Sequence, residues 1–178
     1  VVGGAYENDT TDILSHCLVT IVTPVPGGRI FGGSVTLMNS NSAGIIEGAD
    51  GDLTWSAFDI QYNKSLKNPQ GKAYFLISSD RNSDGEVDGE SHVYLVSSNA
   101  IDVLSTGGGE AVFSSKCTIK EWNDSMLTWD SIEGGALLDI TMTDNNLDNN
   151  QMTPPDTIGI TVLANKNNGG LWFSSNWN

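Results

Sequence analysis

Apolar and polar residues alternate along most of this chain of 178 residues. A period of two is typical of half-buried β-strands, because successive side chains point to opposite faces of a sheet. The clearest example is the run in which Ala136, Leu138, Ile140 and Met142 share one face. No segment carries apolar residues at helical spacing over several turns. The pattern therefore predicts an all-β protein.

About ten segments carry this pattern, and turns rich in Gly, Asn and Asp separate them. The predicted strands are 17–22, 29–38, 53–62, 72–78, 92–97, 99–105, 111–119, 136–142, 158–164 and 171–177. Pro24 and Pro26 end the first strand. Short antiparallel strands at regular spacing favour a β-sandwich of Greek-key or jelly-roll type. We expect one domain over residues 1–178, with a polar N-terminal arm at residues 1–16 that a neighbouring subunit could engage.

The segment at residues 80–91, between two of these strands, is rich in oxygen ligands. Its first, third, fifth, seventh and ninth positions are Asp80, Asn82, Asp84, Glu86 (through its main-chain carbonyl) and Asp88. Alternate residues of a tight loop converge on one point, and hard oxygen ligands suit Ca²⁺. The segment resembles the calcium loops of EF-hands, dockerins and thrombospondin type 3 repeats, although Ser91 stands where an EF-hand has a bidentate Glu. We predict a calcium loop that joins two strands; a solvated acidic turn without metal is the alternative.

A second acidic turn follows the predicted strand at 136–142. It offers Asp144, Asn146 and Asp148 at every second position, but it has no central Gly. It is therefore a weaker candidate for a Ca²⁺ site, and a plain Asn-rich turn is the equal alternative.

Charge and composition limit the partners of the protein. The net charge is −14 and only eight residues are Lys or Arg, which argues against nucleic-acid binding because phosphate contacts need clustered basic residues. No apolar run approaches the roughly 20 residues needed to span a bilayer. The chain begins at Val1 rather than Met, so we expect a leader that is removed or precedes this sequence.

The cysteines and the glycosylation sequons favour an extracellular location. A disulfide between Cys17 and Cys117 would close a loop of about 100 residues and stabilise the fold by about 4–5 kcal/mol on the chain-entropy model. Two buried free thiols are the alternative. Asn8, Asn63 and Asn123 begin Asn-x-Ser/Thr sequons and are candidate glycosylation sites.

Several short motifs of the C-terminal half carry a family resemblance. They are Phe-Ser-Ser-Lys-Cys-Thr-Ile at 113–119, the acidic-ended strand at 134–145, Asp-Thr-Ile-Gly-Ile-Thr-Val at 156–162, and Gly-Leu-Trp-Phe-Ser-Ser-Asn at 170–176. With them, residues 70–177 resemble an uncharacterised secreted β-rich domain found at the C-terminal ends of bacterial and archaeal cell-surface proteins. The resemblance implies a cell-surface or extracellular protein with a structural or adhesive role, and it carries no catalytic residues.

No catalytic motif emerges from the sequence. His16 and His92 lie on separate segments without metal-type spacing, and we expect both on solvent-exposed strand faces. The chain has no nucleophile elbow, phosphate loop or dinucleotide fingerprint. We therefore expect no enzymatic activity, with an unrecognised hydrolase as the alternative.

Two function classes remain. The first is a secreted, calcium-stabilised structural or adhesive subunit of an extracellular filament or surface matrix. It would self-associate or bind other surface proteins, with a neighbouring subunit accepting a terminal strand. The second is a calcium-stabilised carbohydrate-binding module, in which Trp122 and Trp129 stack on glycan rings. Both tryptophans lie among Asn, Asp and Ser in a predicted loop; core packing is the alternative account of them.

Overall fold

A computed structural model describes residues 28–38, 42–48, 51–144, 156–166 and 170–175. Within these ranges the protein is all-β and antiparallel, as predicted. The strands are β1 (Arg29–Met38), β2 (Leu53–Tyr62), β3 (Pro69–Arg81), β4 (Val87–Gly107), β5 (Glu110–Asn123), β6 (Thr128–Thr143), β7 (Thr157–Leu163) and β8 (Leu171–Ser174). This part of the chain holds no helix that could cross a membrane.

The strands form one eight-stranded sheet in which each strand pairs with its neighbours in sequence, from β1 to β8. Neither the second sheet of a sandwich nor ten strands are confirmed. Predicted strand 17–22 lies outside the described residues. Predicted strands 92–97 and 99–105 are parts of one strand, β4, which has 21 residues. Its pairing with β5 is irregular between Ser98 and Ala100, so the chain bends there without leaving the sheet.

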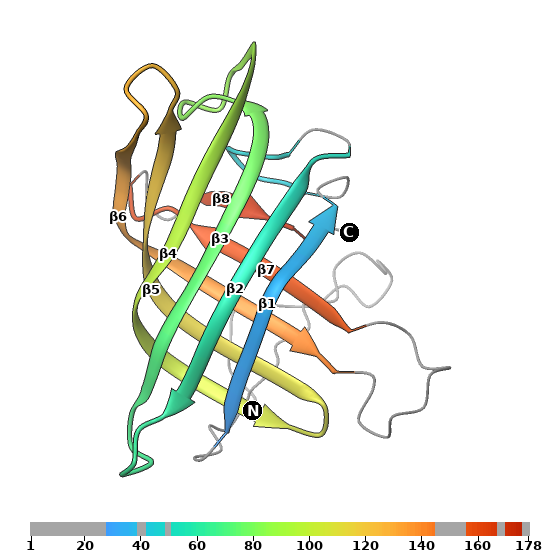
Figure 1. The fold of residues 1–178 in the computed structure, drawn as a ribbon, viewed down its shortest axis with the longest axis vertical. Helices are drawn as coiled ribbons and strands as arrows, with labels where there is room; N and C mark the ends of the chain where they lie inside the picture. The colour runs from blue at the N-terminus through green and yellow to red at the C-terminus, as the bar shows by residue number, and fades with distance from the viewer. Residues whose placement is uncertain (1–27, 39–41, 49–50, 145–155, 167–169, 176–178) are drawn as a thin grey trace, which may run out of the picture.

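One face of the sheet is buried and folds over on itself. In β3, Ala73, Phe75 and Ile77 are buried while the residues between them are exposed. The ring of Tyr94 in β4 meets the ring of Trp172 in β8 edge to face, with 5.5 Å between the centroids. Strands β6–β8 accordingly run behind β1–β3 (Figure 1). The core therefore lies between two parts of the same sheet.

Residues 42–48, which we call the closing segment, connect β1 to β2 and join this region to β8. Ala43 and Ser174 exchange two main-chain hydrogen bonds of 2.9 and 2.8 Å, and the N–H of Ile46 donates to the carbonyl of Trp172 at 2.9 Å. Ile46 is fully buried. Gly44 has φ +121°, and a Cβ there would lie 2.6 Å from the carbonyl oxygen of Trp172, so only glycine fits without strain.

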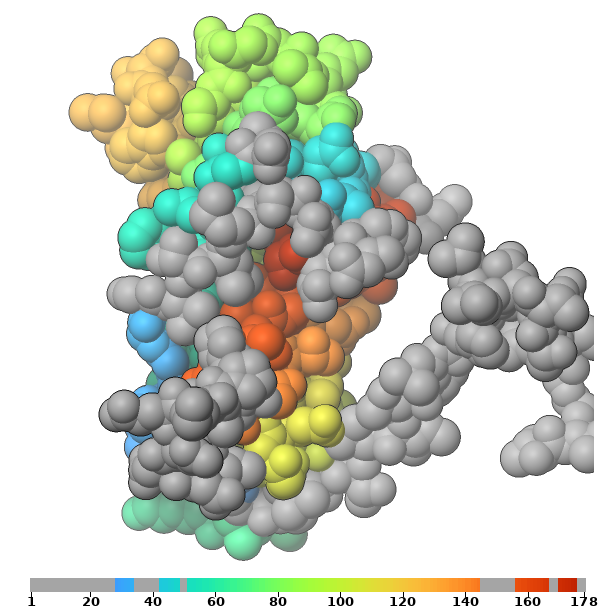
Figure 2. Space-filling view, turned by 90° about the vertical axis from the view of Figure 1, so that its right-hand side faces the viewer, coloured from blue at the N-terminus to red at the C-terminus, as the bar shows by residue number. Residues whose placement is uncertain are grey.

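The described strands leave the opposite end of the folded sheet open. Among the described residues, β1 pairs only with β2. Within the same ranges, β7 pairs with β8 only at Thr161, Val162 and Leu163, so its first residues, Thr157–Gly159, pair with β6 alone. Both β1, in blue, and β7, in orange-red, reach the surface on the side shown in Figure 2. Two strand edges therefore border this end.

Candidate functional site

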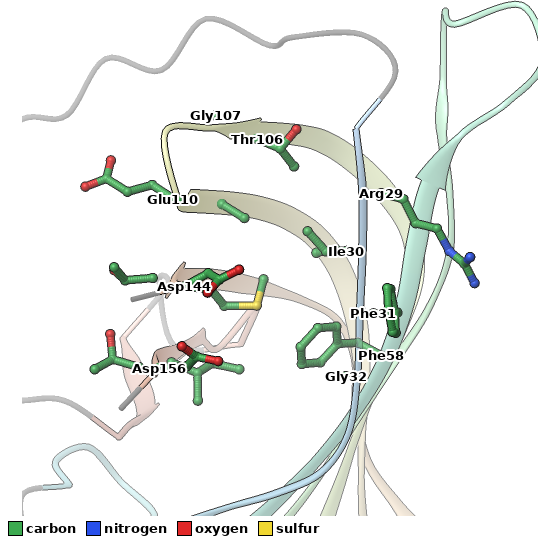
Figure 3. Close-up of a pocket in the computed structure, with 16 residues that line it drawn as sticks. Arg29, Ile30, Phe31, Gly32, Phe58, Thr106, Gly107, Glu110, Asp144 and Asp156 are labelled. Carbon is green, nitrogen blue, oxygen red and sulfur yellow. The ribbon is translucent and has the colours of Figure 1, made fainter. Parts of the chain in front are cut away.

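The open end contains a groove of about 550 Å³ between β1 and the start of β7 (Figure 3). Its floor is apolar and is formed by Ile30, Phe58, Ala111, Met142 and Ile158. Apart from Ile30, which is buried, these side chains are only partly buried, and they pack against the core. The core is therefore incompletely covered by the described residues at this end.

The rim of the groove is acidic. Glu110, Asp144 and Asp156 lie across the groove from β1 (Figure 3). The main-chain N–H of Asp144 donates to the carbonyl of Gly109 at 2.6 Å, which fixes the end of β6 against the β4–β5 turn. An anionic occupant would be repelled at this rim, whereas an uncharged one would not.

The basic residue closest to the groove points away from it. On the outer face of β1, Arg29 binds Asp59 through two hydrogen bonds of 3.0 and 2.9 Å. These bonds hold the pKa of Asp59 below its ordinary value. The guanidinium also lies 5.1 Å from the ring centre of Phe31, which is 73% exposed. The charge of Arg29 is thus compensated locally and leaves the acidic rim unchanged.

The strand edges beside the groove present main-chain hydrogen-bonding groups. A strand edge presents N–H and C=O groups that an added strand can pair with, and an apolar floor takes every second side chain of such a strand. The groove combines both features. The arrangement can therefore accept an extended peptide.

The predicted calcium loop at residues 80–91 is shorter in the structure. Residues 82–86 form the hairpin turn that joins β3 to β4, whereas Asp80 and Asp88 lie within these strands. The side-chain oxygen of Asn82 accepts the N–H groups of Asp84 and Glu86, each at 3.1 Å. The carbonyl of Glu86, the predicted seventh ligand, accepts the N–H of Asn82 at 2.9 Å. Two of the predicted ligands thus form hydrogen bonds within the turn itself.

Among the described residues, no three His, Cys, Asp or Glu side chains form a group that could hold a metal ion. The predicted ligand set also uses Asn82 and the main-chain carbonyl of Glu86, which are not of these types, so Ca²⁺ binding stays a prediction. In the second acidic turn Asp144 is exposed, whereas Asn146 and Asp148 lie outside the described residues.

The hairpin turn lies against the closing segment. Arg81 forms an ion pair with Glu47, and the hydroxyl of Ser79 donates to the carbonyl of Glu47 at 2.7 Å. A Cβ at Gly85 would lie 2.9 Å from a methyl carbon of Ile45. These contacts join the hairpin turn to the closing segment, so a change in the structure of one should affect the other.

His92 is not the exposed strand residue that the sequence predicts. Its side chain is 14% exposed because it lies between two carboxylates. Nδ1 is 2.7 Å from Glu121, and Nε2 is 3.1 Å from Asp88. Burial lowers the pKa of His92, but the two carboxylates outweigh burial and raise it above its ordinary value. The N–H of Glu90 and the imidazole in turn hold the pKa of Asp88 low. His16 lies outside the described residues.

Trp122 and Trp129 are paired across β5 and β6 and contact each other. Their ring centroids are 5.3 Å apart and the ring planes are inclined by 64°. The indole N–H of Trp122 donates to Asp124 at 2.7 Å. Inclined rings do not make the flat platform on which a sugar ring stacks, although Trp122 borders a polar hollow of about 280 Å³.

The remaining predicted residues have structural settings or fall outside the described ranges. Cys117 is buried in the core as a free thiol, while Cys17 and Asn8 are among the residues not described, so the disulfide is untested. Asn63 accepts the N–H of Lys67 at 3.1 Å within the β2–β3 turn. Asn123 uses its Nδ2, the atom that a glycan would modify, to donate to Asp130 at 2.8 Å.

Sequence reasoning missed two surfaces. The groove brings β1 next to β7, which are distant in sequence, and no local pattern indicates it. The outer face of β2 and β3 exposes Trp55 at 46% and Tyr74 at 45%. The inward positions of β2 include Thr54 and Ser56, and this inversion of the usual polarity is the signal that could have identified that face.

Comparison with known proteins gives no family assignment. No protein-family model matches the chain. No significant similarity is found to a curated protein or to a solved structure. The resemblance of residues 70–177 to a secreted surface domain therefore stays a prediction, and function has to be argued from the geometry.

Proposed function

We propose that this protein is a secreted, calcium-stabilised structural or adhesive subunit of an extracellular filament or surface matrix. The observation that supports the proposal is the open end of the sheet, where two strand edges border an apolar groove. Exposed strand edges favour pairing with another chain. When that pairing is head to tail and does not close, it generates a filament.

The same geometry gives the self-association a physical reason. Four of the five floor residues are half-buried, and covering them removes apolar surface from water. A strand added from a neighbour would pair with β1 or β7 and would also cover that floor. The finer fold, an antiparallel β-sandwich of about ten strands within one chain, stays part of the proposal.

We propose that Ca²⁺ binds at residues 80–91. The turn contacts the closing segment through the ion pair of Arg81 with Glu47. The carbonyl of Glu86 accepts a single N–H and keeps a second lone pair for an ion, whereas the side-chain oxygen of Asn82 would give up one of its two internal hydrogen bonds to bind Ca²⁺. We propose that the ion stabilises the closed end of the sheet and lowers the repulsion between acidic subunits of net charge −14.

The direct test measures particle size. Purified protein is examined by light scattering and electron microscopy in calcium, and again after excess chelator. We expect long particles in calcium that shorten when the ion is removed. A protein that stays monomeric at high concentration in both conditions would rule out a polymerising subunit.

A carbohydrate-binding module is the second candidate, because Trp122 borders a hollow that also contains His92, Glu121 and Asp130. Polar groups beside an aromatic ring suit glycan recognition. Titration calorimetry against soluble oligosaccharides, with Trp122→Ala as the comparison, tests this candidate. Binding lost in the variant would support it, and the absence of heat with every oligosaccharide would remove it.

A further inference from the structure

We infer that the groove binds residues 17–22 of a neighbouring copy of this chain, as a β-strand added between β1 and β7. The inference deepens the proposed function and rests on it. It names the segment that is exchanged between subunits and the surface that receives it.

The groove sets three requirements for its occupant. The occupant must be extended, because main-chain groups of β1 and of Thr157–Gly159 border the groove. It must present apolar side chains at alternate positions to a floor that includes Phe58, Met142 and Ile158. It must carry no negative charge where it passes the rim carboxylates of Glu110 and Asp156.

Residues 17–22 meet all three requirements. They read Cys-Leu-Val-Thr-Ile-Val, carry no charge and contain no Pro or Gly. Four of the six are β-branched, which favours extended backbone. Cys17, Val19 and Ile21 share one face, which suits the apolar floor. Fully extended, six residues span about 20 Å.

The other parts of the chain outside the described ranges do not meet them. Residues 1–16 carry Glu7, Asp9 and Asp12. Residues 145–155 contain Asp148 and two prolines. Residues 23–27 contain two prolines and a glycine, and the remaining such segments have three residues or fewer. Within this chain, residues 17–22 are therefore the best occupant.

The sequence between this segment and β1 is compatible with exchange between subunits. Pro24 and Pro26 lack N–H groups, and each restricts the residue before it to extended conformations. Gly27 follows them and tolerates the positive φ that a reversal onto the chain's own β1 would need. The choice of a neighbouring copy therefore rests on the self-association in the proposed function, and occupation of the chain's own groove is one outcome of the test. In a polyproline conformation, four residues such as 23–26 would span about 12 Å.

Two full-length variants test the exchange by complementation. Ile21→Asp places a charge on the inserted face, so this variant accepts a strand but cannot donate one. Ala111→Trp fills the groove, so this variant donates but cannot accept. Thr20→Asn, which adds a polar but uncharged side chain on the other face of the segment, and Ala57→Trp, on the exposed face of β2, are the matched controls. Circular dichroism confirms that each variant is folded.

We expect each test variant alone to be monomeric by light scattering in calcium, while both controls polymerise like the wild type. Mixing Ile21→Asp with Ala111→Trp should give particles of two chains and nothing longer, because each pair has one working donor and one working groove. Wild-type filaments without such pairs in the mixture would overturn the inference and leave the proposed function intact. A monomeric wild type that Ile21→Asp destabilises would show that the segment occupies its own groove, and both proposals would fall.

A peptide probe keeps the inference testable if either variant does not fold. A synthetic peptide of residues 14–23, added in excess to wild-type protein, should occupy grooves and shorten the particles. The same peptide with Ile21→Asp should not. Equal particle lengths with both peptides would overturn the inference.

Discussion

Replacing Gly44 by alanine tests whether the closing segment lies directly against β8. The residue has φ +121°, and an added Cβ would lie 2.6 Å from the carbonyl oxygen and 2.8 Å from the carbonyl carbon of Trp172. Both are main-chain atoms of β8, and the oxygen accepts a hydrogen bond from Ile46, so neither can move without loss of pairing. Two costs therefore add in this variant.

The first cost is conformational, about 1–3 kcal/mol for a non-glycine residue in a sparsely populated region. The second is steric, about 1–3 kcal/mol for overpacking a well-packed site. Gly89→Ala is the matched control, because Gly89 has φ +86° and an added Cβ would meet nothing within 4 Å. The control carries the first cost alone. The Gly44→Ala variant should therefore be less stable than the control by about 1–3 kcal/mol.

Urea unfolding followed by tryptophan fluorescence measures the two free energies of unfolding. In thermal unfolding, 1 kcal/mol corresponds to a Tm shift of about 2–4 °C for a domain of this size. Equal midpoints for Gly44→Ala and Gly89→Ala would refute the close contact of the closing segment with β8. A change in the urea dependence, rather than in the midpoint, would indicate that the variant alters the unfolded ensemble.

Three further predictions concern the metal, the histidine and the thiol. Calcium should raise the Tm of the wild type measured by scanning fluorimetry; Asp84→Asn should remove this rise, and Asp102→Asn, an exposed carboxylate outside the turn, should not. A wild-type Tm that does not change when calcium is added would contradict the predicted site. His92 has its pKa raised by folding, so its stabilising effect is fully present below about pH 6.5 and is lost as the pH rises through the folded pKa. The difference in urea midpoint between the wild type and His92→Gln should therefore shrink from pH 5.5 to 8.5, and a growing difference would contradict this assignment. Burial, with the nearby charge of Glu133, raises the pKa of Cys117 to about 12. In a Cys17→Ser variant the thiol should resist Ellman's reagent at pH 8 until urea unfolds the protein, whereas reaction in the native state would argue against a buried Cys117.

The elements of the fold follow from local pattern, whereas their arrangement does not. A period of two identifies strands, and residues 82–86, the middle of the predicted calcium loop, connect two of them. The pattern does not say which face is inside. In β2 both faces carry apolar residues, and the structure buries Ile60 while it exposes Trp55 at 46%. The sequence alone therefore does not decide which face of β2 is buried.

The sequence divides β4 into two predicted strands for a related reason. Polar residues at Ser97, Ser98 and Asn99 resemble a turn, but β4 continues through them with irregular pairing. The side chain of Ser98 is buried and accepts the N–H of Ala73 at 2.8 Å. This polar residue of β4 therefore stabilises the contact with β3. Such a hydrogen bond depends on a neighbouring strand and has no signature in the local sequence.

The candidate site was the least predictable part. The groove depends on how far the sheet folds over, which places β1 near β7. Its floor residues look like ordinary strand residues in the sequence. The metal prediction relied on loop spacing alone, and the hydrogen bonds of Asn82 show that the same spacing also suits a hairpin turn.

The order of the strands has a kinetic consequence. Every pairing between consecutive strands forms a hairpin or a short-range contact, and hairpins form in about 1–10 μs. The pairing of Ala43 with Ser174 is the exception, because it joins regions near opposite ends of the sequence and carries a larger loop-closure entropy. We expect the closing segment to dock late in folding. Until it docks, the strand edges at both ends of the sheet are exposed, and this is the interval in which nascent chains are most prone to aggregate.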